Sequence, residues 1–201
     1  LDLWVPGVPL TVTSTGCCTI SVGYTPSVPP GGEVVTATVG ISATEVITDI
    51  PRDTVVELTA DDSDVCCEFD SWVIDGEDPI TTTETITVAM DSDHSAVATC
   101  SVPGPYTLTV TSEGCCGILA EHDAITDTVA AGESEDFVDL GCGTVVTLTA
   151  SAPEGCSSDG WQVDDVPFAS NPITVTMHAD QTAVATCWYK LFLLIIAKNS
   201  G

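Results

Sequence analysis

The chain has 201 residues and a formal net charge of −27, because only three basic residues, Arg52, Lys190 and Lys198, offset 30 acidic ones. A surface this acidic repels phosphates, which excludes nucleic-acid binding and disfavours anionic lipid headgroups. Hydrophobic residues make up 44% of the chain, which excludes disorder driven by low hydrophobicity. No apolar run reaches the ~18 residues that a membrane-spanning helix needs.

Ten cysteines in a chain of this length indicate an oxidising compartment and a disulfide framework. No C-x-x-C occurs, and no cysteine has zinc-type spacing with a histidine, which disfavours a metal protein or a redox enzyme. We therefore expect a secreted protein, extracellular or displayed on the cell surface. The chain opens LDLWVPGVPL, without the basic region of a secretory signal, so we expect a mature, processed form.

The sequence contains an internal duplication of four blocks that return in the same order. The blocks and their counterparts are LTVTSTGCC (10–18) and LTVTSEGCC (108–116), TVVELTA (54–60) and TVVTLTA (144–150), SWVIDG at Trp72 and GWQVDD at Trp161, and ITVAMDSDHSAVATC (86–100) and ITVTMHADQTAVATC (173–187). The first copy is longer, chiefly between Cys18 and Thr54.

The blocks are rich in β-branched residues and are separated by Gly, Pro and Asp clusters, which is typical of short strands. The predicted fold is all-β, with two tandem β-sandwich-like modules stapled by disulfides. The expected parts are an N-terminal arm (1–9), a first repeat (10–102), a second repeat (105–188) that follows the linker SVPGP (101–105), and an apolar C-terminal strand or tail (189–201).

The alternation within ITVAM predicts that Ile86, Val88 and Met90 share one face of a strand, with Thr87 and Ala89 on the other. The tryptophans of the two copies, which fall at equivalent points, are predicted to be core aromatics. The alternative is a surface tryptophan on which a sugar stacks.

The blocks resemble the divergent internalin-B-type repeat, also called the bacterial repeat domain. Its pattern is an opening LTV strand, a G-T-x-V-x-L-x-A strand, a tryptophan strand and a closing I-x-V-x-M-x-x-D-x-x-V-x-A strand pair. The second copy supplies GTVVTLTA (143–150), GWQVDD (160–165) and ITVTMHADQTAVAT (173–186), and the first has matching blocks. The resemblance implies stalk or adhesion modules of surface proteins, without catalytic residues. The dense cysteines, the long insert of the first copy and the apolar tail depart from the pattern.

All ten cysteines are expected to form disulfides, and they follow the repeat: Cys17, Cys18, Cys66, Cys67 and Cys100 in the first copy, and Cys115, Cys116, Cys142, Cys156 and Cys187 in the second. Adjacent cysteines point to opposite faces of a strand, so members of a vicinal pair should have different partners. We expect one bond from each vicinal pair to the closing strand and another to the cysteine before the tryptophan. Cys142 and one of Cys66 and Cys67 are then left over, and they join the two repeats or link neighbouring chains.

Carboxylates cluster in several expected loops, and hard oxygen ligands of this kind are what calcium requires. The candidate calcium ligands are Asp61, Asp62, Asp64, Asp91 and Asp93. The alternative is a solvated surface that keeps the protein soluble. No other metal or cofactor is expected.

No nucleophile elbow, P-loop or dinucleotide fingerprint is present. The counterpart of His94 is Gln181, which argues against a catalytic role for this histidine, and we expect no enzyme. A secreted glycosidase with paired carboxylates is the least favoured class. The Thr-rich segment TTTET (81–85) is a candidate for O-linked sugars.

The two ends of the chain are apolar. The run LFLLIIA (191–197) follows the closing strand directly and is apolar on both faces, so it must be buried on both sides. It completes the core of the second copy, inserts as a donated strand into a neighbouring subunit, or is the remnant of a membrane anchor or sorting tail. The expected subunit contacts are Leu191, Phe192, Leu193, Leu194, Ile195 and Ile196, and in the N-terminal arm Leu1, Leu3, Trp4 and Val5.

The sequence thus predicts a non-catalytic extracellular structural protein. The leading hypothesis is a subunit of a surface filament or pilus that polymerises with copies of itself, head to tail, by donation of a terminal strand. The alternative is a monomeric cell-surface stalk or adhesin that binds a host or matrix ligand.

Overall fold

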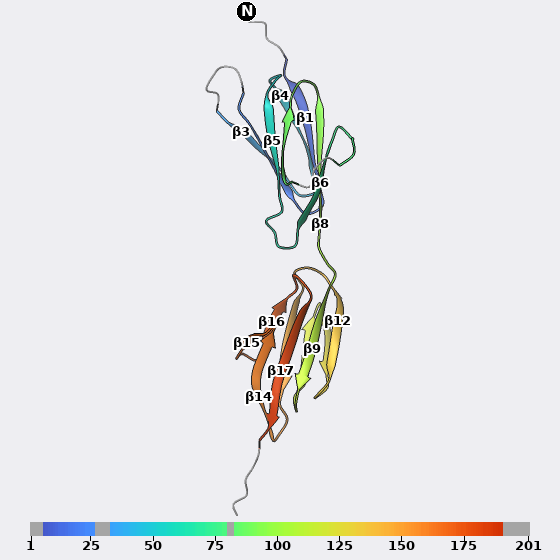
Figure 1. Ribbon diagram of the computed structural model, residues 1–201, viewed down its shortest axis with the longest axis vertical. Coiled ribbons are helices and arrows are strands. Elements are labelled where there is room, and N and C mark those ends of the chain that lie inside the picture. The colour runs from blue at the N-terminus through green and yellow to red at the C-terminus, as the bar shows by residue number, and fades with distance from the viewer. Residues whose placement is uncertain (1–5, 27–32, 80–82, 191–201) are drawn as a thin grey trace, which may run out of the picture. The chain divides into compact units, whose positions relative to one another are not determined.

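The computed structural model describes residues 6–26, 33–79 and 83–190. The chain divides into two compact units, Leu1–Pro103 and Gly104–Gly201, and the division falls within the SVPGP segment. The described residues contain strands, turns and bends but no helix. Within each unit the strands form two sheets (Figure 1), which confirms the predicted all-β sandwich class.

The first unit has eight strands, which form two four-stranded sheets. These are β1 (Val8–Thr15), β2 (Thr19–Tyr24), β3 (Val35–Val39), β4 (Thr44–Ile50), β5 (Val55–Asp61), β6 (Glu68–Ile74), β7 (Thr85–Ala89) and β8 (His94–Ser101). One sheet, called the β1 sheet here, has the order β4-β1-β8-β6, and the other, the β2 sheet, has the order β3-β2-β5-β7. Strands β1 and β8 pair in parallel, whereas the other neighbours are antiparallel.

The second unit repeats this arrangement and adds one short edge strand. Its strands are β9 (Tyr106–Glu113), β10 (Gly117–His122), β11 (Ile125–Val129), β12 (Ser134–Leu140), β13 (Val145–Ser151), β14 (Cys156–Val163), β15 (Val166–Phe168), β16 (Ile173–Thr176) and β17 (Gln181–Tyr189). The β9 sheet has the order β12-β9-β17-β14-β15, and the β10 sheet has the order β11-β10-β13-β16. The short edge strand β15 has no counterpart among the described strands of the first unit.

Most of the extra length of the first copy falls between β2 and β3. Strand β2 ends at Tyr24 and β3 begins at Val35, whereas β10 and β11 are joined by only Asp123 and Ala124. Both of these turn residues have positive φ, 45° and 63°, as a tight two-residue hairpin turn requires. The insert leaves the strand order unchanged.

Each unit has its own core between its two sheets, built from the buried half of each alternating strand. The predicted facing of ITVAM is confirmed, since Val88 and Met90 are buried and Ile86 packs against the core, while Thr87 and Ala89 are exposed. Burial of an apolar side chain of this size stabilises the fold by about 1.5–3 kcal/mol.

The two predicted core tryptophans are indeed buried, with Trp72 0% and Trp161 2% exposed. A sugar cannot stack on a ring that solvent does not reach, so the surface alternative is wrong. The Trp72 indole N–H donates to the carbonyl of Glu84 at 3.0 Å, and the Ala60 amide donates to the same oxygen at 3.0 Å. A backbone carbonyl therefore satisfies both groups in the first unit.

In the second unit the Asn171 side chain takes over this function. Its Oδ1 accepts from the Ala150 amide at 2.9 Å and from the Trp161 indole N–H at 3.4 Å. Its Nδ2 donates to the Ala150 carbonyl at 2.8 Å. The amide side chain thus pairs with the end of β13 as a neighbouring strand would.

Replacing Asn171 with Ala is expected to destabilise the second unit by about 1–2 kcal/mol, because the Ala150 amide and carbonyl lose their partner at a partly buried position. Chemical denaturation monitored by tryptophan fluorescence measures the loss. The exposed neighbour Ser170 provides the control, since Ser170→Ala should change the free energy of unfolding by less than about 0.5 kcal/mol. Equal effects of the two substitutions would contradict the capping function of Asn171.

Candidate functional site

The most distinctive duplicated feature is the corner at which the chain passes from the first sheet of each unit to the second. The block T-S-x-G-C-C builds this corner in both copies. The Ser14 hydroxyl donates to the carbonyl of Cys18 at 2.6 Å, and the Ser112 hydroxyl donates to the carbonyl of Cys116 at 2.5 Å. Both serines are buried. Their place inside a repeated block is the sequence signal for this function, which the predicted site residues do not include.

The glycine of the corner lies against the closing strand. Gly16 has a φ of 96°, and a Cβ built on it would lie 1.8 Å from the carbonyl oxygen of Cys100. Gly114 has a φ of 102°, and its Cβ would lie 1.9 Å from the carbonyl oxygen of Cys187. Only glycine fits at these two positions, because both the backbone conformation and the space exclude a side chain.

Two disulfides tie each corner to the rest of its unit. The four bonds are Cys17–Cys67, Cys18–Cys100, Cys115–Cys156 and Cys116–Cys187. One bond of each corner reaches the closing strand, and the other reaches the cysteine before the tryptophan, which is the pairing that the repeat predicts. Cys66 and Cys142 are also disulfide-bonded. No described cysteine is free.

The acidic loop at residues 61–64 directs its carboxylates to backbone amides. Asp61 accepts from the Ser63 amide at 3.0 Å, and hydrogen bonds from Ser63 lower the pKa of this carboxyl. Asp62 accepts from the Phe69 amide at 3.2 Å, and Asp64 accepts from the Cys66 amide at 2.8 Å. The described residues contain no group of three or more His, Cys, Asp or Glu that could hold a metal ion, so these ligand candidates are not gathered into a calcium site.

The His94 imidazole is held between two carboxylates of the first unit. Its Nδ1 lies 2.7 Å from Oδ2 of Asp75, and its Nε2 lies 3.0 Å from Oδ1 of Asp91. The other Asp75 oxygen accepts from the Ser95 amide at 2.8 Å. Both ring nitrogens donate only in the imidazolium form, so the geometry favours a protonated ring. The candidate calcium ligand Asp93 is not among these partners.

These contacts raise the pKa of His94 and lower the pKa values of Asp75 and Asp91. The hydrogen bond to Asp75 is the main cause that raises the pKa of His94. The Ser95 amide, followed by His94, lowers the pKa of Asp75, and His94 lowers the pKa of Asp91. In the second unit Gln181 takes the place of the histidine, and its Nε2 donates to Asp164 at 3.2 Å without titrating.

The contacts of His94 with Asp75 and Asp91 predict a pH dependence of stability for the first unit. The His94 contribution is fully present below the usual histidine pKa of about 6.5, and it is lost as the pH rises through the raised folded value. The aspartate contributions are present above the usual carboxyl pKa and are lost as the pH falls through the lowered folded values. We therefore expect the first unit to lose up to about 1 kcal/mol between pH 6 and pH 9, as partly exposed ion pairs do.

Denaturation curves of wild-type protein and the His94→Gln variant across this pH range measure the effect. The variant imitates the second unit and should abolish the loss above pH 6.5. An unchanged pH profile in the variant would show that other groups are responsible.

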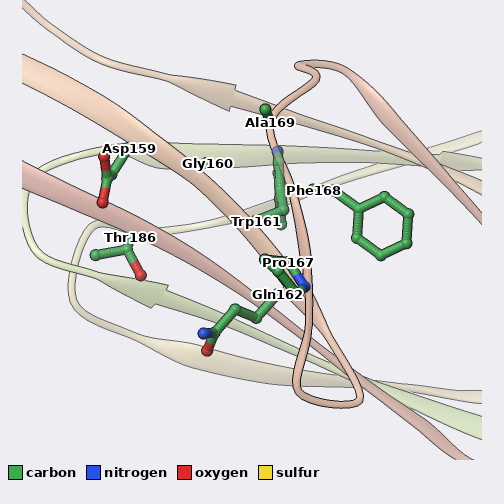
Figure 2. Close-up of a pocket in the computed structure, with 8 residues that line it drawn as sticks. All are labelled: Asp159, Gly160, Trp161, Gln162, Pro167, Phe168, Ala169 and Thr186. Atoms are coloured by element: carbon green, nitrogen blue, oxygen red, sulfur yellow. The ribbon is translucent and has the colours of Figure 1, made fainter.

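An open hollow of about 380 Å³ lies where β14, β15 and β17 meet. Trp161 and Ala185 point into the core, so their neighbours Gln162 and Thr186 point to the outer face of the β9 sheet. Figure 2 shows Asp159, Gln162 and Thr186 on one side of the β15 segment, with the Phe168 ring directed to the other side.

Gly160 shapes this hollow at a β-bulge. The register of β14 against β17 shifts between Ser158 and Gly160, and a Cβ on Gly160 would lie 2.7 Å from the carbonyl oxygen of Phe168. The glycine therefore lets β15 approach β14 closely. The hydrogen-bonding side chains of Asp159, Gln162 and Thr186 on this face suit a small polar ligand. The sequence carried no signal for this hollow, because its residues come together only through strand pairing.

The edges of the four sheets differ in charge. The outer strands β4, β6, β11 and β12 carry carboxylates, and β15 is short and contains a proline, features that block pairing with other chains. In contrast, the edge strands β3, β7 and β16 contain no charged residue. An apolar strand can join these three edges without burying a carboxylate.

The terminal segments predicted as subunit contacts lie outside the described residues, because the description begins at residue 6 and ends at residue 190. The predicted boundary between the second repeat and its tail also changes. Strand β17 includes Tyr189, which pairs with Cys156, and the Lys190 amide donates to the carbonyl of Gly155 at 2.7 Å. Over the ranges described above, no helix is long and apolar enough to cross a membrane.

The comparisons with known proteins give likenesses at low sequence identity. None of the curated proteins matches it. Among solved structures, it is similar to the major pilin protein T-13 of Streptococcus pyogenes, with 11% identity and a TM-score of 0.47 over 92% of this chain and 98% of that chain. It is also similar to a C-terminal fragment of the pilus adhesin SpaC of Lactobacillus rhamnosus GG, with 9% identity and a TM-score of 0.47 over 94% of this chain and 100% of that chain.

The family comparison concerns the second unit. Residues 120–190 match the family model of the divergent InlB B-repeat domain, which confirms the resemblance for this part of the chain. The resemblance of the first copy to this domain stays a prediction that rests on the internal repeat.

Proposed function

We propose that the protein is a non-catalytic structural subunit of an extracellular filament, which assembles head to tail when one chain donates a terminal strand to the next. The observation that carries this proposal is the presence of uncharged sheet edges, at β3, β7 and β16, in a chain whose closing strand leads directly into an apolar, strand-length segment. Main-chain hydrogen bonds to such an edge provide affinity, and alternate side chains provide specificity.

Charge supports the tail as the donor. Two of the chain's three basic residues, Lys190 and Lys198, flank the apolar run LFLLIIA, while the whole chain carries a net charge of −27. Acidic subunits repel one another, but this tail is attracted to a neighbour's surface. Salt weakens both this attraction and the repulsion between subunits, because it screens all exposed charges.

Negative-stain electron microscopy of the native, unreduced protein tests the proposal. Regular fibres with a repeat of one two-unit bead support strand-linked assembly, whereas discrete particles under all salt conditions refute it. The matched variant ends at Lys190 and keeps β17 complete, including its bond to Gly155. This variant should fold with unchanged thermal stability but form no fibres. Fibres made by the truncated chain would refute donation by this tail and leave residues 1–5 as the candidate donor.

The second candidate function is a monomeric stalk or adhesin that binds a ligand, and the hollow at β14 and β15 favours it. Glycan-array and peptide-array binding by the isolated protein tests this function. Gln162→Ala should abolish binding, while Thr174→Ala, at an exposed polar residue of the other sheet, should not. Equal binding by both variants would exclude the hollow as the ligand site.

A further inference from the structure

The first and last strands of each unit are neighbours that run in the same direction. In the first unit, β1 and β8 pair in parallel from Leu10 with His94 to Thr15 with Thr99. A pull on the two ends of the unit draws the start of β1 and the end of β8 apart along the strand axis. The hydrogen bonds between the strands cross this axis, so they are loaded together in shear.

A disulfide also connects the first and last strands of the unit covalently. Cys18 follows β1 and is bonded to Cys100 near the end of β8, across a sequence separation of 82 residues. A force that enters at Val8 reaches Cys18, crosses the bond to Cys100 and leaves at Ser101. Residues 19–99 are not on this path, although they make up most of the unit.

The second unit has the same construction. Strands β9 and β17 pair in parallel from Leu108 with Gln181 to Glu113 with Thr186. Cys116 follows β9 and is bonded to Cys187 of β17, across a separation of 71 residues. The other corner disulfide, Cys115–Cys156, does not by itself close this path, because it leaves residues 157–187 between the ends.

We propose that this protein is a tension-bearing link, in which Cys18–Cys100 and Cys116–Cys187 carry the load past the folded body of each unit and make it nearly inextensible. The loaded part of each unit is one strand that is already extended, at about 3.3 Å per residue. Complete loss of the non-covalent structure then lengthens a unit by only about 10 Å. The inference concerns a single chain and does not require assembly.

Force spectroscopy on the full chain, held by handles at its two ends, tests this inference. The oxidised protein should show no unfolding extension longer than a few tens of ångströms. After reduction by a thiol, the contour length should increase by about 280 Å from the first unit and about 240 Å from the second, at about 3.4 Å per residue. Long unfolding extensions in the oxidised protein would overturn the proposal.

Two double variants distinguish the loss of the load-bearing disulfide from the loss of the other corner disulfide in the second unit. Oxidised Cys116→Ser/Cys187→Ser should gain about 100 Å of contour length, because residues 157–187 then lie on the path. The oxidised Cys115→Ser/Cys156→Ser variant also loses one corner bond, but its contour length should not increase. Thiol titration verifies the remaining bonds, and the contour length is defined whether or not a variant keeps its fold. Equal gains in both variants would overturn the proposal, while failure of the electron microscopy test would leave it intact.

Discussion

Complete reduction of the disulfides is expected to unfold both units under conditions in which the oxidised protein is stable. Each of the four described bonds closes a separation of 41 to 82 residues, which in the chain-entropy account stabilises a fold by about 4 kcal/mol per bond. Two such bonds per unit equal a large share of the 5–15 kcal/mol that a domain usually has. Small sandwich cores of this kind seldom supply that amount alone.

Tryptophan fluorescence is the measurement, because each core buries one tryptophan, Trp72 in the first unit and Trp161 in the second. We expect their emission to shift to longer wavelength after reduction and alkylation. The oxidised protein treated with the alkylating reagent alone is the control and should remain unchanged, since no described cysteine is free. A reduced protein that still unfolds cooperatively would show that the cores are sufficient without the bonds.

Substitution of the corner glycines is expected to have the second largest effect. A Cβ at Gly16 or Gly114 would overlap a carbonyl oxygen of the closing strand, at 1.8 or 1.9 Å. That oxygen belongs to a backbone held by sheet pairing and by a disulfide, so it cannot move aside cheaply. We expect Gly16→Ala and Gly114→Ala to destabilise their units by more than about 4 kcal/mol.

Two other glycines provide matched controls. Gly76 in the first unit and Gly155 in the second also have positive φ, 71° and 84°, but no atom lies within 4 Å of the Cβ position. Gly76→Ala and Gly155→Ala should therefore cost only the conformational strain, about 1–2 kcal/mol. Thermal denaturation compares the four variants, and similar losses for corner and control glycines would contradict the steric explanation.

Much of this architecture can be predicted from the sequence, because alternation and duplication are both visible in the order of residues along the chain. The two-residue period of ITVAM identifies which side chains enter the core. The recurrence of the vicinal cysteines, the cysteine before the tryptophan and the closing cysteine provides the pairing of four bonds. These features depend on neighbours along the chain or on comparison of one copy with the other.

Other features depend on residues that are distant in the sequence, and only the tertiary structure decided them. Asn171 completes a strand end in one unit while a Glu84 carbonyl does so in the other, and no local pattern distinguishes these two solutions. Of the candidate calcium ligands, Asp61, Asp62 and Asp64 accept from nearby backbone amides, whereas Asp91 accepts from His94.

The sequence by itself determined the sandwich class, the duplication and the oxidised cysteines, because burial periodicity and cysteine recurrence are properties of the chain. Only the tertiary structure decided that the first and last strands of each unit run in parallel beside each other. The physical reason is that strand neighbours are chosen by packing between the two sheets, over separations that no local propensity encodes.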